Sequence, residues 1–258
     1  MGGGTSGTVT ASSGGTGRIR YYGNGWYRIS WTDTSTSAGD AYFLLAFTNN
    51  NPTATRRPSY AGQTDANVFV CYPQLEASPI ATSYIPTPVV GGTSSSVTRV
   101  KDDIYLTSAS SLIGQTEGTL FIEVDWREQG SGSSQFIFGV GDGADTDVAG
   151  IFYSNNVDEL RMLLKESNSA ETNQGITPTW SSGVHKFAFA YKQNDCKLFV
   201  DGSEVSADTS VDMTGFSVSE VHFGQNDQAG DQANMWIRAV ALFTTRLSDP
   251  ECEALTTI

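Results

Sequence analysis

Apolar and polar residues alternate in many short segments of this chain. Residues 119–126 read TLFIEVDW, and residues 185–191 and 197–200 have the same aromatic and β-branched character between turn-forming residues. A period of two with turn residues roughly every 8 to 12 positions is typical of antiparallel β-sandwiches, so we predict an all-β protein. Further strands are predicted at residues 26–31, 41–48, 67–72, 135–140, 149–153, 160–165, 218–224 and 235–243.

Two local signals add detail to this pattern. Residues 248–256 have helical character, with Ser248 as the N-cap and Pro250 and two acidic residues in the first turn. The pair Asp201-Gly202 lies between two apolar runs and predicts a two-residue hairpin turn, because both residue types accept positive φ angles. We expect Asp201 to serve this turn and not catalysis.

Composition changes along the chain and indicates two domains. Residues 86–96 begin with prolines and continue with glycines and serines, as in an interdomain linker. Residues 1–98 carry 5 basic and 4 acidic side chains, whereas residues 99–258 carry 10 and 24. We therefore predict a first domain at 1–88, a linker at 89–98 and a second domain at 99–258.

The net charge of −13 excludes several classes of function. So acidic a surface repels nucleic acid and anionic membranes, and the longest basic cluster is Arg56-Arg57.

The first residues lack a basic region followed by an apolar one, so no cleaved secretory signal is expected. No apolar run approaches the roughly 20 residues of a membrane span. The three cysteines have no CxxC spacing, which predicts idle thiols without a disulfide framework.

Two sets of motifs resemble known families. The segments GNGWYRISWT and YPQLEASPIATSYIPT resemble the carbohydrate-binding-module-like jelly rolls of bacteriophage tail proteins, followed by a Val-Thr-Arg stretch at residues 97–99. The segments EGTLFIEVDW, GVHKFAFAYKQNDCKLFVDGSEV and MWIRAVALFTTRLSDPECEAL resemble laminin-G-like, concanavalin A-like sandwiches. The resemblance implies a partial jelly roll followed by a concanavalin A-like sandwich.

The resemblance also implies a function. We expect a non-enzymatic virion protein of a tailed phage, a tail fibre, spike or other appendage, whose second domain attaches to host-surface glycans. A whole jelly roll of this type has additional strands ahead of Gly17, so we expect other virion proteins or further copies of this chain to complete the first domain. The alternative is a purely structural virion subunit with no ligand of its own.

Sugar binding requires an exposed aromatic ring that stacks on the apolar face of a pyranose, with polar neighbours for its hydroxyls. Strict alternation places Trp26 and Trp31 on opposite faces of one strand, and we expect Trp26 to be packed and Trp31 exposed. The candidate glycan-binding residues are Trp31, Tyr60, Trp180 and Trp236.

Two loops are rich in carboxylates, which favours polar solvent-exposed loops and leaves a calcium site as the alternative and the candidate cofactor site. Calcium prefers several oxygen ligands from such loops, although the full EF-hand pattern is missing. The candidate ligands are Asp142, Asp145, Asp147, Asp227 and Asp231.

A third hypothesis is a glycan-degrading enzyme. The segment EVDWRE resembles the E-x-D-x-x-E strand of laminarinase-like glycoside hydrolases, and alternation places Glu123 and Asp125 on one strand face, with Glu128 returned to it by a bulge. Arg127 departs from that pattern, because the position is apolar in those hydrolases. Nucleophilic catalysis has little support, since the two histidines lie in predicted strands and no G-x-S-x-G elbow occurs.

Overall fold

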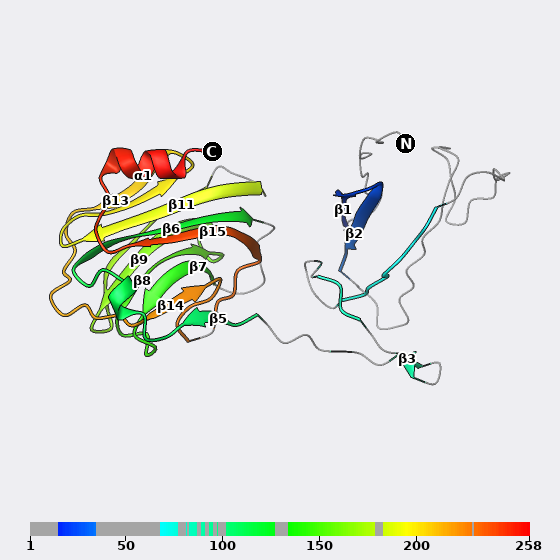
Figure 1. Cartoon of the computed structure of the whole chain (residues 1–258), viewed down its shortest axis with the longest axis horizontal. Coiled ribbons are helices and arrows are strands. Elements are labelled where there is room, and N and C mark those ends of the chain that lie inside the picture. Colours follow the sequence, from blue (N-terminus) through cyan, green and yellow to red (C-terminus); the bar gives the residue numbers. More distant parts are fainter. Residues whose placement is uncertain are drawn as a thin grey trace. The chain divides into compact units, whose positions relative to one another are not determined.

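The computed structural model describes residues 15–34, 68–76, 81, 83–86, 89–90, 93–94, 97, 102–126, 134–178, 183–228 and 230–258. The chain divides into two compact units, Met1–Arg99 and Val100–Ile258. The described strands pair in an antiparallel manner, and one short helix lies near the C-terminus, so the all-β prediction is confirmed (Figure 1). The assignment of residues 1–88 to a jelly roll and 89–98 to a linker stays a prediction.

The described part of the first unit contains a β-hairpin. Strands β1 (Thr16–Gly23) and β2 (Trp26–Thr32) are joined by Asn24-Gly25, whose φ angles of 51° and 80° match the twist of the strands. A second, very short pair is formed by β3 (Val89–Val90) and β4 (Thr93–Ser94).

Two predictions for the first unit are wrong. Trp26 is not packed, because 46% of its surface is exposed, compared with 42% for Trp31. The strand predicted at residues 67–72 is absent over its described residues, 68–72.

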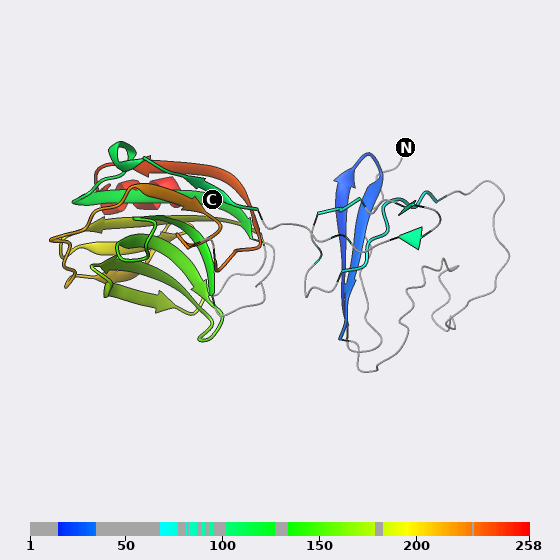
Figure 2. The same ribbon diagram turned by 90° about the horizontal axis from the view of Figure 1, so that it is seen from below.

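The second unit is a sandwich of two antiparallel sheets. One sheet has six strands in the order β10-β9-β8-β7-β14-β5, and the other has five in the order β13-β12-β11-β6-β15. Figure 2 views the six-stranded sheet, with helix α1 behind it. The elements are β5 (Ile104–Leu106), η1 (Ser110–Leu112), β6 (Glu117–Trp126), β7 (Ser134–Gly141), β8 (Val148–Ser154), β9 (Glu159–Glu166), β10 (Ser169–Ile176), β11 (Gly183–Lys192), β12 (Cys196–Val200), β13 (Ser203–Asp208), β14 (Glu220–Phe223), β15 (Met235–Phe243) and α1 (Asp249–Thr256).

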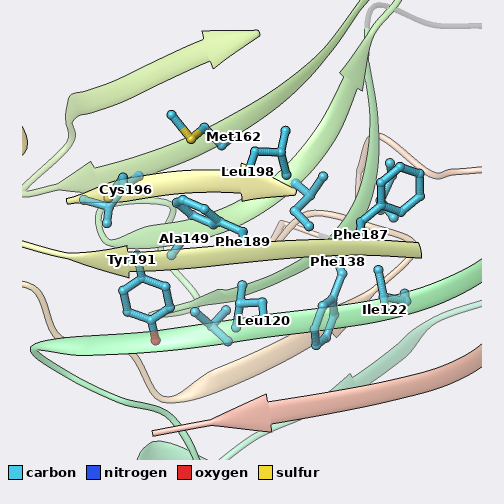
Figure 3. Close-up of a cluster of buried hydrophobic side chains, with 14 of the residues drawn as sticks. Leu120, Ile122, Phe138, Ala149, Met162, Phe187, Phe189, Tyr191, Cys196 and Leu198 are labelled. Carbon is cyan, nitrogen blue, oxygen red and sulfur yellow. The ribbon is translucent and has the colours of Figure 1, made fainter. Parts of the chain in front are cut away.

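The main core fills the space between the two sheets. Alternate residues of β6 and β11 point into it, as Figure 3 shows for Leu120, Ile122, Phe187 and Phe189. Their opposite neighbours come from β7, β8 and β9 and are also fully buried. At one end Tyr191 donates a hydrogen bond from its hydroxyl to the Gly114 carbonyl at 2.8 Å, and burial raises the pKa of this phenol.

Helix α1 covers part of the outer face of the five-stranded sheet. Phe121, Ala188, Ala190 and Phe199 form a second apolar cluster there with Cys252 of the helix. The helix begins as predicted, because the Glu251 carboxylate accepts a hydrogen bond from the backbone N–H of the N-cap residue at 2.8 Å. The helix ends at Thr256 and packs only on the part of the face around these apolar residues.

The predicted turn Asp201-Gly202 is also confirmed, with φ angles of 49° and 85°. The Asp201 carboxylate accepts a hydrogen bond from the backbone N–H of Lys186 at 2.9 Å and lies 2.7 Å from Nδ1 of His185, so it organises the hairpin. Among the described residues, no helix is long and apolar enough to cross a membrane.

Candidate functional site

Among the described elements, α1 covers only one part of the outer face of the five-stranded sheet. Phe121 lies under the helix, so the alternation of β6 places Glu123 and Asp125 on the same outer face, further along the strand. The side-chain ammonium group of Lys186 on β11 donates a hydrogen bond to the Thr257 carbonyl at 2.7 Å and marks the border with the helix. We call the adjoining area the Trp236 face and define it by six residues: Glu123, Asp125, Val184, Lys186, Trp236 and Arg238.

The strand register brings these residues together from three strands. Asp125 lies between Val184 of β11 and Trp236 of β15, and Glu123 is paired with Lys186 of β11. Side chains of directly paired residues lie roughly 4.5–5.5 Å apart at Cβ and point to the same side of the sheet. Trp236 is therefore the direct neighbour of Asp125 on this face, and 51% of its surface is exposed.

A β-bulge on β15 adds a guanidinium group to the face. The register shifts between Ile237 and Ala239, so Arg238 is the extra residue opposite Glu123. Its Nε atom lies 3.1 Å from Oε1 of Glu123, and the arginine side chain is half-exposed whereas the glutamate is mostly buried. Bulges of this kind redirect a side chain and occur preferentially beside functional sites.

This arrangement has the chemistry of a sugar-binding surface. An exposed indole offers a flat apolar area to the C–H groups of a pyranose ring. Carboxylates accept hydrogen bonds from hydroxyl groups, and the guanidinium donates to ring or hydroxyl oxygens. Of the four predicted glycan-binding residues, Trp236 lies within such a set of partners.

The other predicted aromatic residues lie elsewhere or outside the described residues. Trp31 is half-exposed on β2 of the first unit, where its ring lies against Gly15. Tyr60 and Trp180 are not among the described residues. Their predicted roles stay predictions.

Two of the three carboxylates considered as catalytic groups, Glu123 and Asp125, are among the described residues. Glu123 and Asp125 share one face of β6, as alternation predicts, and Glu123 forms its ion pair with Arg238. Glu128 lies outside the described residues, so the structure does not describe the third carboxyl of the motif.

The five predicted calcium ligands have other roles. Asp142 accepts hydrogen bonds from the backbone N–H groups of Ala144 and Thr146 and from the Thr146 hydroxyl. Burial opposes the effect of these bonds, yet together they lower the pKa of Asp142. Asp145 forms an ion pair with Lys165 at 2.9 Å.

The remaining three carboxylates stabilise loops. Asp147 is buried and accepts hydrogen bonds from the backbone N–H groups of Ser167 and Ser217, both at 2.8 Å. Asp231 accepts a hydrogen bond from the Asn226 amide at 3.0 Å, and Asp227 accepts one from the backbone N–H of Asp145 at 2.8 Å. Within the described part of the chain, no three His, Cys, Asp or Glu side chains form a metal-binding group. The calcium ligation of these five aspartates stays a prediction.

A buried polar cluster lies on the outer face of the six-stranded sheet, where the sequence predicted only a strand. His222 is 4% exposed, stacks on Tyr105 at a ring distance of 6.0 Å, and lies 3.2 Å from the Glu220 carboxylate. The loop that follows β14 returns over β7, so that Asp227 packs against Gly141. Burial raises the pKa of Asp227.

Sequence reasoning missed Arg238 and Lys186 as members of the Trp236 face. Arg238 follows Trp236 by two positions in a predicted strand, and this spacing was the available signal that both side chains share one face. The neighbours of β6 were not predictable, because β15 and β11 lie far away in the chain.

Comparisons with known proteins give structural matches only. No protein-family model matches the chain, and no curated protein matches it. The carbohydrate-binding module CBM40 of the Ruminococcus gnavus IT-sialidase is similar at 18% identity and a TM-score of 0.45, covering 60% of this chain and 97% of the module. That module is also known bound to α2,3-sialyllactose.

Whole sialidases are matched as well. The sialidase of Trypanosoma rangeli matches at 20% identity and a TM-score of 0.44, covering 55% of this chain and 22% of the enzyme. The leech intramolecular trans-sialidase matches at 16% identity and a TM-score of 0.44, covering 61% of this chain and 27% of the enzyme. This chain thus spans about a quarter of each of these enzymes. Our expectation of a non-enzymatic protein is corrected here and not retained, since the solved structures with a similar fold include sialidases.

Proposed function

We propose that the second unit binds glycans through the Trp236 face. The observation that carries this proposal is the half-exposed indole of Trp236, which lies beside Asp125 and the Glu123–Arg238 ion pair. The stacked ring supplies apolar contact, and the charged side chains supply directional hydrogen bonds. The face lies on a rigid sheet, which reduces the cost of ordering the site when a ligand binds.

Replacement of Trp236 by alanine tests this proposal. Burying one large apolar side chain is worth roughly 1.5–3 kcal/mol, which corresponds to a roughly 10- to 100-fold loss of affinity. Glycan-array binding of the full chain would identify ligands, and calorimetry would measure their affinities. The matched control is Val240→Ala, because Val240 is on the same strand, 42% exposed, and paired with the inward-facing Ile122.

The two variants show whether glycan binding depends on Trp236 or is sensitive to any exposed apolar side chain of this strand. We expect Trp236→Ala to lose binding and Val240→Ala to retain it, with both variants folded by circular dichroism. Equal affinities of Trp236→Ala and the wild-type chain would exclude this face as the binding site. A wild-type chain that binds no glycan on the array would refute the proposal.

We place this binding activity on a bacteriophage virion appendage, on the support of the tail-protein motifs in the sequence. Attachment to host-surface glycans by repeated copies would turn weak individual contacts into avidity. The protein would then be found by mass spectrometry in purified particles, together with other virion proteins. Its absence from such particles would contradict this placement.

A second candidate function is that of a structural subunit that docks through the first unit. The observation in its favour is the β1–β2 hairpin, whose side chains Tyr21, Tyr22, Trp26, Ile29 and Trp31 are each at least 42% exposed. Large exposed apolar areas mark interaction sites in soluble proteins. Sedimentation analysis of the full chain and of Ile29→Asp would test whether copies associate through this hairpin.

A further inference from the structure

We infer that Arg238 makes the Trp236 face selective for glycans that carry an anionic group, a carboxylate or a sulfate ester, beside the stacked ring. This inference rests on the proposed function and adds the class of ligand. It comes from the contacts of Arg238 within the described residues, which differ from those of the other described arginines of the second unit.

Arg161 and Arg246 use their whole guanidinium groups within the protein. Arg161 bonds to Asn173 through Nε and Nη2 and to Glu159 through Nη1. Arg246 is mostly buried, and its Nη1 and Nη2 atoms bond to Leu247, Asp195 and Asp249, while Nε forms an ion pair with Asp195. Both arginines therefore stabilise the fold.

Arg238 uses one side of its guanidinium group. Its ion pair with Glu123 involves Nε, and no described residue accepts a hydrogen bond from Nη1 or Nη2. The side chain is 52% exposed, so the two terminal nitrogens are accessible. The planar pair of terminal N–H groups matches the two oxygens of a carboxylate, and it also accommodates sulfate.

Glu123 acts as a positioning residue for this arginine. It is 20% exposed and lies on the central strand β6, so it holds the Nε side of the guanidinium at the sheet surface. Arg238 is the bulged residue of β15, two positions after Trp236, and it shares with Ala239 the place opposite Glu123. An anionic group on a sugar that stacks on Trp236 would meet the two terminal nitrogens.

The overall charge gives this site a distinctive salt dependence. From Val100 onward the chain has 9 basic and 24 acidic side chains, so an anionic glycan is repelled at long range. Salt screens this repulsion over a Debye length of about 10 Å at 0.1 M. We therefore expect the affinity for an anionic glycan to rise between low and moderate salt, while the affinity for its neutral counterpart stays unchanged.

The test uses three forms of one oligosaccharide: neutral, carboxylated and sulfated. Calorimetry with the full chain should show about tenfold tighter binding of an anionic form than of the neutral one, as expected for a charge-assisted hydrogen bond at a half-exposed site. Arg238→Gln should bind all three forms with the affinity of the neutral one. Arg238→Lys should keep part of the preference, because it retains the charge but not the fork.

The matched control is Lys192→Gln. Lys192 is 53% exposed and forms an ion pair with Glu117 at the opposite end of β11 and β6, so this variant makes the same change in net charge away from the face. It should keep the wild-type preference. Circular dichroism and urea unfolding would verify that each variant is folded.

The outcomes distinguish the inference from the proposed function. Preference for the carboxylated form alone, or for both anionic forms, supports the inference and identifies the group recognised. Equal binding of all three forms by the wild-type chain, or an unchanged preference in Arg238→Gln, overturns the inference. Glycan binding that is lost in Trp236→Ala would then still support the proposed function. The absence of binding to any form would remove both.

Discussion

Replacement of Asp147 by alanine should strongly destabilise the second unit. This carboxylate is 8% exposed, and its two oxygens accept hydrogen bonds from the backbone N–H groups of Ser167 and Ser217, both at 2.8 Å. Hydrogen bonds to charged groups contribute about 1.5–3 kcal/mol each, so the loss of both should cost about 3–6 kcal/mol. Small domains have about 5–15 kcal/mol of total stability, and this loss would be a large part of it.

Two further variants make the measurement specific. Asp147→Asn keeps one acceptor oxygen and should lose about half as much stability. Asp145→Ala removes the ion pair between the half-exposed Asp145 carboxylate and Lys165 and should cost about 1 kcal/mol. Guanidinium unfolding, followed by circular dichroism, gives the free energy of unfolding for each chain.

Calcium dependence is the decisive control for Asp147. The unfolding curves should be measured both in a chelator and in millimolar calcium. We expect the loss in Asp147→Ala to be the same in both. A loss below about 1 kcal/mol, or one that appears only in calcium, would refute the role of Asp147 as a backbone acceptor and would favour a metal-binding role.

Two other predictions concern titratable groups. Burial raises the pKa of Asp227, so the native state binds the carboxyl proton more tightly than the unfolded chain does. The protonated carboxyl therefore contributes its full stability to the fold below the unfolded pKa, and this contribution is lost as pH rises through the folded pKa. Asp227→Asn should therefore be more stable than the wild-type chain at pH 7 and less dependent on pH between 4 and 7, and thermal unfolding that shows no gain at pH 7 would contradict this. Burial also raises the pKa of Cys196 to about 12 and that of Cys252 to about 11, whereas Cys71 is exposed. Iodoacetamide at pH 8 should modify one thiol per native chain, Cys71, and three after denaturation, as counted by mass spectrometry; fast native labelling at a second cysteine would contradict the buried packing.

Local pattern was enough to predict the central elements of the sandwich. The strand predicted at 235–243 has the bounds of β15, and the N-cap of the helix is Ser248 as expected. These elements bury one or both faces, so their apolar residues recur with a clear period. The edge strands β10 and β13 were missed, because they are polar and exposed and gain their strand structure from pairing with β9 and β12.

The same distinction applies to the candidate site, where some residues were predictable from local pattern and others only from strand pairing. Alternation along one strand was sufficient to place Glu123 and Asp125 on a common face, since that follows from the geometry of an extended chain. The arrival of Trp236 and Arg238 beside them depends on the pairing of β15 with β6, more than a hundred residues apart in the chain. Asp147 and Asp227 show the converse, because their place in acidic loops did not reveal that their oxygens accept hydrogen bonds from backbone N–H groups of distant loops. The sequence by itself determined which residues carry chemistry and which way they face along a strand, and the tertiary structure decided which of them meet, because strand pairing depends on contacts across the whole core.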